Sequence, residues 1–258
     1  MILVSTKKRL ITLLIILVSG IILFILGLGS TGLVDETPPL FAAAARAMSE
    51  SGDWLTPKVN GIFRFDKPPL IYWLMGFFYS LPKNETWDSL GTLSARLPSA
   101  LASLFLMLMI GDTLFCWPQK GDRQFLTPIV ASLGFALSPL IIIWTRTAVS
   151  DALFTGTLGI SLLLFWRKMA SKNNDQCISA WVFLGLAILT KGPVAFVLTI
   201  LTITSFLFSQ KDWKNLLSKI NPKKGFLITI LISAPWYILE LIKEGKRSEE
   251  HTSELQSP

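Results

Sequence analysis

Residues 10–28 read LITLLIILVSGIILFILGL, nineteen almost continuously apolar positions that follow Lys7, Lys8 and Arg9. The apolar core of a secretory signal peptide is roughly 7–15 residues long, whereas a helix needs about 20 residues to cross the hydrocarbon of a bilayer. The stretch therefore predicts an uncleaved first transmembrane helix.

Six further apolar runs follow, and the whole chain is rich in such residues. Of its 258 residues 51% are hydrophobic and 16% are charged, and the mean hydropathy is +0.54. This is too apolar for a soluble domain of this length. The composition predicts an all-α polytopic membrane protein with further spans at residues 97–117, 125–144, 152–166, 178–189, 194–208 and 226–242.

The basic residues predict the orientation of the chain, because cytoplasmic loops are enriched in lysine and arginine. With a cytoplasmic N-terminus, most of them fall on the cytoplasmic side and the long loop between residues 30 and 96 lies outside. The net charge of +7 is then divided among separate short segments and forms no continuous stripe for a phosphate backbone. We expect membrane lipid as a partner and no nucleic acid.

Two charged clusters stand out in this outer loop, Asp35–Glu36 and Asp66–Lys67. Carboxylates and a lysine beside a lipid surface cost desolvation energy, which favours a chemical role for them. The loop also predicts two interfacial helices, one from the Pro38–Pro39 pair to Gly52 and one over residues 70–81, with turn chemistry at Asn60–Gly61 between them. The second run is too short to span, so we expect its aromatic rings at headgroup depth.

Five stretches resemble one family of membrane enzymes, and their order along the chain is consistent. They read DETPPLFAAAARAMSESGDWLTPKVNG (35–61), FDKPPLIYWLMG (65–76), ARLPSALAS (95–103), TRTAVSDALF (145–154) and LTKGPVAFVL (189–198). They resemble the lipid-linked sugar transferases of the GT-C type, the group of dolichyl-phosphate-mannose protein mannosyltransferases and aminoarabinose transferases. The resemblance implies a GT-C-like transmembrane helix bundle that is longer than this chain and carries an outer soluble domain.

The end of the chain departs from this pattern. Residues 247–258 read RSEEHTSELQSP and resemble the translation of a sequencing-adapter oligonucleotide, so we expect an artefact that includes the single histidine, His251. The alternative is a genuine polar tail. If residues 247–258 are an artefact, residues 1–246 are the N-terminal part of a truncated GT-C-like glycosyltransferase domain, and we expect this fragment alone to be inactive.

The resemblance implies a glycosyltransferase that moves a hexose or pentose from a polyprenyl-phosphate donor to an unknown lipid, glycan or protein acceptor. The reaction would take place at the outer face of a bacterial inner membrane. Asp35 matches the main catalytic carboxylate of the family, with Glu36 beside it, and Asp151 matches a second acidic position. An acceptor hydroxyl must lose its proton as it attacks the anomeric carbon, and a positioned base contributes about 10² to 10⁴ in rate.

Other matching positions imply contacts to the donor phosphate and possible metal chemistry. Lys67, Lys191 and Arg64 are candidates for the phosphate, and Asp66 stands where the aminoarabinose branch has a glutamate, which makes it a candidate ligand for a divalent metal cofactor. Two departures count against that branch: it tends to carry an arginine where this chain has Pro38–Pro39, and its metal ligands include histidines. Arg46, Arg96 and Arg146 could also bind phosphate, and the sequence does not rank them.

Each candidate also has a purely structural interpretation. Asp35, Glu36 and Asp151 could cap helices, Asp66 and Lys67 could form a local ion pair, and Lys191 could extend its charge to the interface. A transporter or channel is the rival function, for which polar groups should line the membrane midplane. A third alternative is a non-catalytic assembly factor that binds a partner through the aromatic run.

Overall fold

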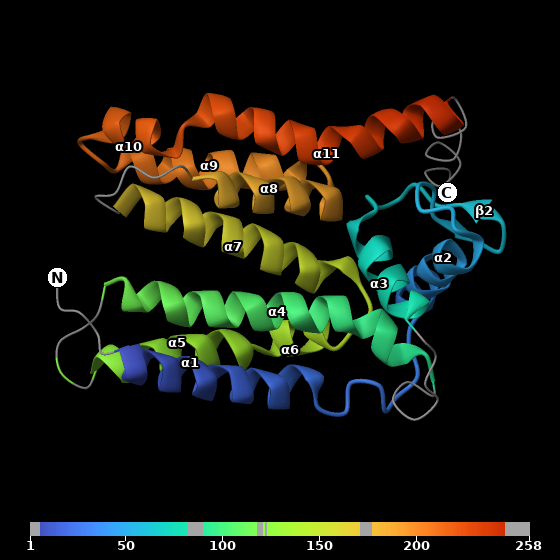
Figure 1. The fold of residues 1–258 in the computed structure, drawn as a ribbon, viewed down its shortest axis with the longest axis horizontal. Coiled ribbons are helices and arrows are strands. Elements are labelled where there is room, and N and C mark those ends of the chain that lie inside the picture. The colour runs from blue at the N-terminus through green and yellow to red at the C-terminus, as the bar shows by residue number, and fades with distance from the viewer. Residues whose placement is uncertain (1–5, 82–89, 118–120, 122, 171–176, 246–258) are drawn as a thin grey trace.

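The computed structural model describes residues 6–81, 90–117, 121, 123–170 and 177–245, and within these ranges the protein is almost entirely helical (Figure 1). The predicted tail, residues 247–258, lies outside the described residues. The helical segments are α1 (Thr6–Gly20), the π-helical η1 (Ile21–Ile25), α2 (Thr37–Ser51), α3 (Leu70–Ser80), α4 (Thr92–Phe115), α5 (Arg123–Ala136), α6 (Pro139–Thr145), α7 (Ser150–Ala170), α8 (Ile178–Lys191), α9 (Val194–Phe208), α10 (Trp213–Ile220) and α11 (Pro222–Glu244).

All seven predicted apolar runs form helices, but fewer of them are long and apolar enough to cross a membrane. Among the described residues three segments qualify, Thr6–Ile25, Thr92–Phe115 and Trp213–Glu244. The helices α5 and α6 qualify only as a pair, and they meet at 67°. Ser138 adopts an extended ψ of 125° before Pro139, as the residue before a proline usually must, and this ends α5. The predicted span over 125–144 is therefore a broken one.

Three of the predicted runs fall short for different reasons. The helix α7 has 21 residues but is not apolar enough by the same measure, whereas α8 and α9 have only 14 and 15 residues. At 1.5 Å per residue a 15-residue helix covers about 23 Å, less than the roughly 30 Å of bilayer hydrocarbon. These helices complete the bundle by packing against the long ones.

The long helices lie side by side, and small residues hold the central pair together (Figure 1). A Cβ atom added to Gly156 of α7 would lie 2.8 Å from the carbonyl oxygen of Ala102 in α4, so the two backbones are in close contact. The buried hydroxyl of Ser161 donates to the carbonyl of Ala180 at 2.8 Å and joins α7 to α8. In a membrane the lipid is as apolar as the side chains, so helices associate through close packing at small residues and through interhelical hydrogen bonds.

At the end of the bundle where α1 begins, Asp112 of α4 has a structural role. It accepts hydrogen bonds from Arg9 of α1 and, at 3.0 Å, from Arg167 of α7. One carboxylate therefore ties three helices together at that end.

At the opposite end, α2 and α3 pack side by side and run in the same direction (Figure 1). Three contacts in register fix this: Phe41 stacks on Tyr72 with ring centroids 5.2 Å apart, a Cβ atom at Gly76 would lie 3.1 Å from the carbonyl oxygen of Ala45, and the guanidinium of Arg46 lies 5.0 Å from the ring of Tyr79. The chain returns from the end of α2 to the start of α3 through a short antiparallel hairpin.

That hairpin consists of β1 (Lys58–Val59) and β2 (Ile62–Phe63). Asn60 and Gly61 form its turn with φ angles of 52° and 80°. Positive φ at both central residues is the geometry that favours the Asn–Gly pair, so the predicted turn is confirmed.

The α2–α3 pair is anchored to the bundle by a buried apolar cluster. Phe41 of α2 and Ile71 of α3 pack in it with Leu153 of α7, Leu189 of α8 and Trp236 of α11. One ring of the aromatic run, Tyr72, is fully buried in this cluster and so faces the protein interior, whereas the headgroup depth of the run stays a prediction. An 11-residue helix turns some of its side chains inward, whatever their type.

Candidate functional site

The parallel packing of α2 and α3 brings the two charged clusters to the same end of the bundle. Asp35–Glu36 immediately precede α2, and Asp66–Lys67 stand just before α3. Phe41 and Tyr72, which stack on each other, lie in the first part of their helices, so the two helix starts are neighbours. The positive ends of two helix dipoles therefore point to one region, where an anion is favoured.

Asp35 has the most unusual backbone of the candidates. It is exposed and has a φ of 79°, in the left-handed region. A non-glycine residue there costs on the order of 1–3 kcal/mol, and such residues cluster at functional sites. Its Oδ1 accepts the backbone N–H of Glu36 at 2.8 Å, which accounts for one of the two carboxylate oxygens. Glu36 is the N-cap residue of α2 but makes no side-chain capping bond, so the capping interpretation does not hold for it.

Arg64 and Asp66 are partners of each other. Arg64 donates from Nη2 to Oδ2 of Asp66 at 2.9 Å and from Nε to the hydroxyl of Tyr72 at 3.1 Å. Its guanidinium also lies 5.3 Å from the ring of Phe41. Both sequence-predicted roles, phosphate binding by Arg64 and metal ligation by Asp66, would require the loss or sharing of these contacts.

Lys67 differs from its neighbours because no carboxylate pairs with it among the described residues. The alternative of an Asp66–Lys67 ion pair is therefore wrong: Asp66 pairs with Arg64 instead. Lys67 is half-buried and stands just before the start of α3, and its phosphate-binding role stays a prediction.

Asp151 and Lys191, predicted separately, are in direct contact. Asp151 lies in the first turn of α7 and Lys191 is the last residue of α8, and Nζ lies 2.6 Å from Oδ1. Both side chains are less than one-third exposed. This pair ties α7 to α8 at the end of the bundle that carries α2 and α3, and it neutralises both charges. Their catalytic and phosphate-binding roles remain predictions.

The described residues do not fit a divalent metal. Among the described ranges no group of three or more His, Cys, Asp or Glu side chains is placed to hold one. Asp66 is engaged by a guanidinium, and the only histidine lies outside these ranges. We assign no step to a metal.

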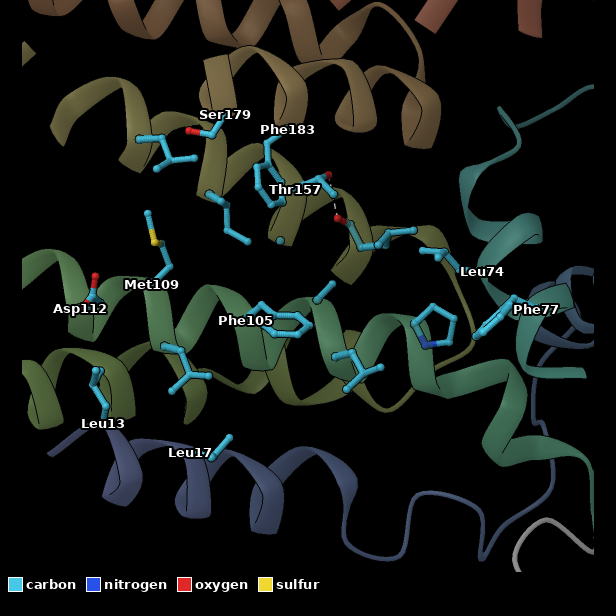
Figure 2. Close-up of a pocket in the computed structure, with 18 of the residues that line it drawn as sticks. Leu13, Leu17, Leu74, Phe77, Phe105, Met109, Asp112, Thr157, Ser179 and Phe183 are labelled. Carbon is cyan, nitrogen blue, oxygen red and sulfur yellow. Dashed lines mark hydrogen bonds between the residues drawn. The ribbon is translucent and has the colours of Figure 1, made fainter. Parts of the chain in front are cut away.

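A long apolar groove of about 1120 Å³ opens beside this end of the bundle and runs along α4 and α7 (Figure 2). Leu74 and Phe77 of α3 line one end and Asp112 lies at the other, with Phe105 between them. A second apolar groove of about 850 Å³ lies among α8, α9, α10 and α11, with Trp181 and Phe196 in its wall. Only the first groove is lined by α3, the helix that follows Lys67.

One polar cluster at this end has no counterpart in the sequence-based predictions. Both oxygens of Asp53, just after α2, accept hydrogen bonds at 3.0 Å from Lys243 near the end of α11, and Lys58 donates to one of them at 3.1 Å. Close by, Thr56 donates to Glu240 at 3.1 Å. The cluster fastens the end of α11 to the loop after α2. Asp53 and Lys243 are 190 positions apart in the sequence, so no local sequence pattern predicts their contact.

The Asp53 cluster predicts a pH-dependent stability. Burial alone would raise the pKa of Asp53, but the hydrogen bonds from Lys243 and Lys58 lower it from 3.8 to about 2. A carboxyl group whose pKa is lower in the folded than in the unfolded protein stabilises the fold when the pH is above its unfolded-state pKa. This stabilisation is lost as the pH falls from about 4 to about 2. We expect Asp53→Asn to lower the free energy of unfolding by about 2 kcal/mol at neutral pH. On the acid side of the pH profile, the unfolding temperature of this variant should fall less steeply than that of the wild type. An acid limb identical to that of the wild type would contradict the pairing.

Comparison with known proteins places the chain among membrane sugar transferases. Residues 66–239 match the family described as Dolichyl-phosphate-mannose-protein mannosyltransferase. The chain is 28% identical over 220 residues to the undecaprenyl phosphate-alpha-4-amino-4-deoxy-L-arabinose arabinosyl transferase 2 of Pseudomonas fluorescens, covering 83% of this chain and 37% of that protein. It is also 32% identical over 200 residues to an uncharacterized protein of Aquifex aeolicus, covering 77% and 41%.

Two solved structures share the fold. The crystal structure of ArnT from Cupriavidus metallidurans in the apo state matches 90% of this chain and 42% of that chain, with a TM-score of 0.78 and 22% identity. The same protein bound to undecaprenyl phosphate matches 89% and 41%, with a TM-score of 0.74 and 22% identity. The predicted fold class is confirmed, and the chain is an integral membrane protein that spans about four-tenths of the length of these relatives.

Proposed function

The chain belongs to the dolichyl-phosphate-mannose-protein mannosyltransferase family, and from that premise we propose that the whole protein is a membrane glycosyltransferase. It moves a sugar from a polyprenyl-phosphate donor to an acceptor at the outer face of a bacterial inner membrane, with its N-terminus in the cytoplasm. One observation carries the proposal: Lys67, which pairs with no carboxylate in the described part of the chain, precedes α3 where the starts of α2 and α3 meet, in the same region as the exposed Asp35.

In the proposed reaction, Asp35 and Lys67 act on opposite sides of the transferred sugar. The acceptor hydroxyl gives its proton to the free oxygen of Asp35 as its oxygen bonds to the anomeric carbon. The bond between that carbon and the phosphate oxygen breaks, and the polyprenyl phosphate leaves with the bonding electrons. Lys67 and the two helix starts stabilise the charge that collects on the phosphate.

The apolar groove supplies a place for the prenyl chain of the donor. Its lining on α4 extends from Pro98 to Asp112, fifteen residues whose fourteen steps along the helix axis cover about 21 Å. One end of it is lined by Leu74 and Phe77 of α3, seven and ten residues after Lys67, and the residues around it are almost all apolar (Figure 2). Phosphate at the mouth and hydrocarbon along the groove match the two chemical halves of a polyprenyl phosphate.

The apolar groove also counts against the rival function of a transporter. A transport pathway needs polar groups near the membrane midplane to replace water around its substrate. In the described part of the chain, the ion pairs made by Asp112 and Asp151 stand in the terminal turns of their helices instead. A lipid-facing transferase requires no polar pathway.

Sugar transfer by the whole protein in lipid vesicles tests this proposal. The donor is a polyprenyl phosphate that carries a radiolabelled sugar, and envelope fractions serve as acceptor. We expect the label to leave the donor and to appear in a product that chromatography separates from it. Movement of the intact donor across the membrane without transfer would contradict the proposal and favour a transporter.

A further inference from the structure

Arg96, in the second turn of α4, holds the backbone that leads from the first span to Asp35. It is 7% exposed. Its Nη1 donates to the carbonyl oxygens of Leu28 at 2.7 Å and Thr31 at 2.9 Å, and its Nη2 donates to that of Gly32 at 2.8 Å. The bound carbonyls end three residues before Asp35.

Arg146, which follows α6, holds the preceding part of the same segment. Its Nη1 donates to the carbonyl oxygen of Leu23 and its Nη2 to that of Leu26, both at 3.0 Å. The guanidinium groups of Arg146 and Arg96 therefore bind successive parts of residues 23–32. Thr92 adds a hydrogen bond to the carbonyl of Gly29 at 3.2 Å.

These contacts occur where the first span ends. The last carbonyls of a helix have no partner within it and form the negative end of its dipole, so cations are favoured there. An ordinary helix end is satisfied by water or by one capping group. Here neither arginine pairs with a carboxylate among the described residues, and their hydrogen bonds go to backbone carbonyls and, from Arg96, also to the hydroxyl of Thr31 at 3.1 Å.

The segment beyond the arginines is held from its other side as well. Leu33 packs against the apolar cluster that contains Phe41, whereas Val34 is 78% exposed. Asp35 then adopts its left-handed φ of 79° directly before α2. The placement of its carboxylate therefore depends on two anchors, the arginine contacts before it and helix α2 after it.

We propose that Arg96 and Arg146 are positioning residues that order residues 23–32 and so set the place of the Asp35 carboxylate. The meaning of that placement for catalysis rests on the proposed function. Both Nη groups of Arg96 donate to carbonyls, its Nε is buried and the residue is only 7% exposed, so it is far less accessible to a phosphate than the half-buried Lys67. This separates Arg96 from Lys67.

The test measures segment order and catalysis independently in the whole protein. All native cysteines of the whole protein, among them Cys116 and Cys177, are first replaced with serine, and a nitroxide is attached to Val34→Cys for electron paramagnetic resonance. We expect Arg96→Gln to give a narrower, more mobile spectrum than the parent. In unlabelled protein the same substitution should lower kcat about tenfold to a hundredfold, as expected for a displaced catalytic group, with the donor KM near its parent value.

A matched control loses stability elsewhere in the bundle. The buried hydroxyl of Ser132 donates to the carbonyl of Met107 at 3.0 Å, far along α4 from Arg96. Ser132→Ala should lower the unfolding temperature but leave both the spectrum and kcat unchanged. Arg96→Lys keeps the charge without the forked geometry and should fall between Arg96→Gln and the parent.

Three results would overturn the proposal: an unchanged spectrum in Arg96→Gln, a mobile spectrum with unchanged kcat, or a raised donor KM with unchanged kcat, which would make Arg96 a phosphate ligand. Failure of the parent to transfer sugar is a separate result. It would refute the proposed function, whereas the spectra would still report whether Arg96 orders the segment.

Discussion

Asp35→Asn should lower kcat for sugar transfer by about 10² to 10⁴, the contribution of a positioned base. Asparagine matches aspartate in size and keeps an oxygen that can accept the N–H of Glu36, a bond of 2.8 Å in the native protein. The substitution removes only the negative charge and the proton-accepting oxygen. Donor binding and the amount of protein in the membrane should therefore be unchanged.

The measurement is transfer from the radiolabelled donor under single-turnover conditions, with donor binding assayed separately. Glu50→Gln is the matched control, because Glu50 is also exposed and lies at the far end of α2. It should transfer at the parent rate. Parent-like transfer by Asp35→Asn would remove this carboxylate from the mechanism.

Lys67→Gln should lower kcat/KM for the donor by about 10² to 10³, the range found when one preorganised donor to a developing charge is removed. Lys67 pairs with no carboxylate among the described residues, so removing its charge leaves no carboxylate there without a partner. The unfolding temperature should change little. Lys67→Arg keeps the charge and should recover part of the loss.

Kinetics and binding of polyprenyl phosphate together check this second prediction. Lys58→Gln is the control, since Lys58 is the lysine of the nearby hairpin and pairs with Asp53. It should lose some stability and keep its affinity for polyprenyl phosphate. Equal affinity in Lys67→Gln and the parent would show that the donor phosphate binds elsewhere.

The sequence predicted those features that depend on local patterns. Apolar periodicity gave the helices, the Asn60–Gly61 pair gave the turn, and the order of short motifs gave the family. The broken span at Ser138–Pro139 was also readable in principle, because proline restricts the residue before it. Apolar composition outweighed that signal when the span was predicted.

The partners of the charged residues could not be predicted, because they depend on the tertiary arrangement. Asp151 and Lys191 were both identified, but 40 residues separate them and only the packing of α7 on α8 makes them a pair. Asp66 was expected to serve a metal or Lys67, whereas Arg64 occupies it. Because the backbone bends at this point, Arg64 reaches the carboxylate of Asp66 from two residues away, whereas the adjacent Lys67 does not pair with it.

The four candidate arginines illustrate the same limit. The sequence predicted Arg64 as a phosphate ligand and left Arg46, Arg96 and Arg146 as unranked alternatives. In the fold Arg64 binds Asp66, and both Arg96 and Arg146 bind backbone carbonyls. The carbonyl groups at the end of a membrane helix need hydrogen-bond donors, and the fold decides which side chains supply them. No sequence motif marks these side chains.

The central claim is that a polyprenyl phosphate binds with its phosphate at the start of α3 and its chain along α4 and α7. Photo-crosslinking of the whole protein with a polyprenyl phosphate that carries a diazirine near the phosphate and, in a second probe, along the chain tests this directly. The account predicts adducts in residues 67–77 for the first probe and in α4 or α7 for the second. Adducts confined to the groove walls formed by α9, α10 and α11 would contradict it.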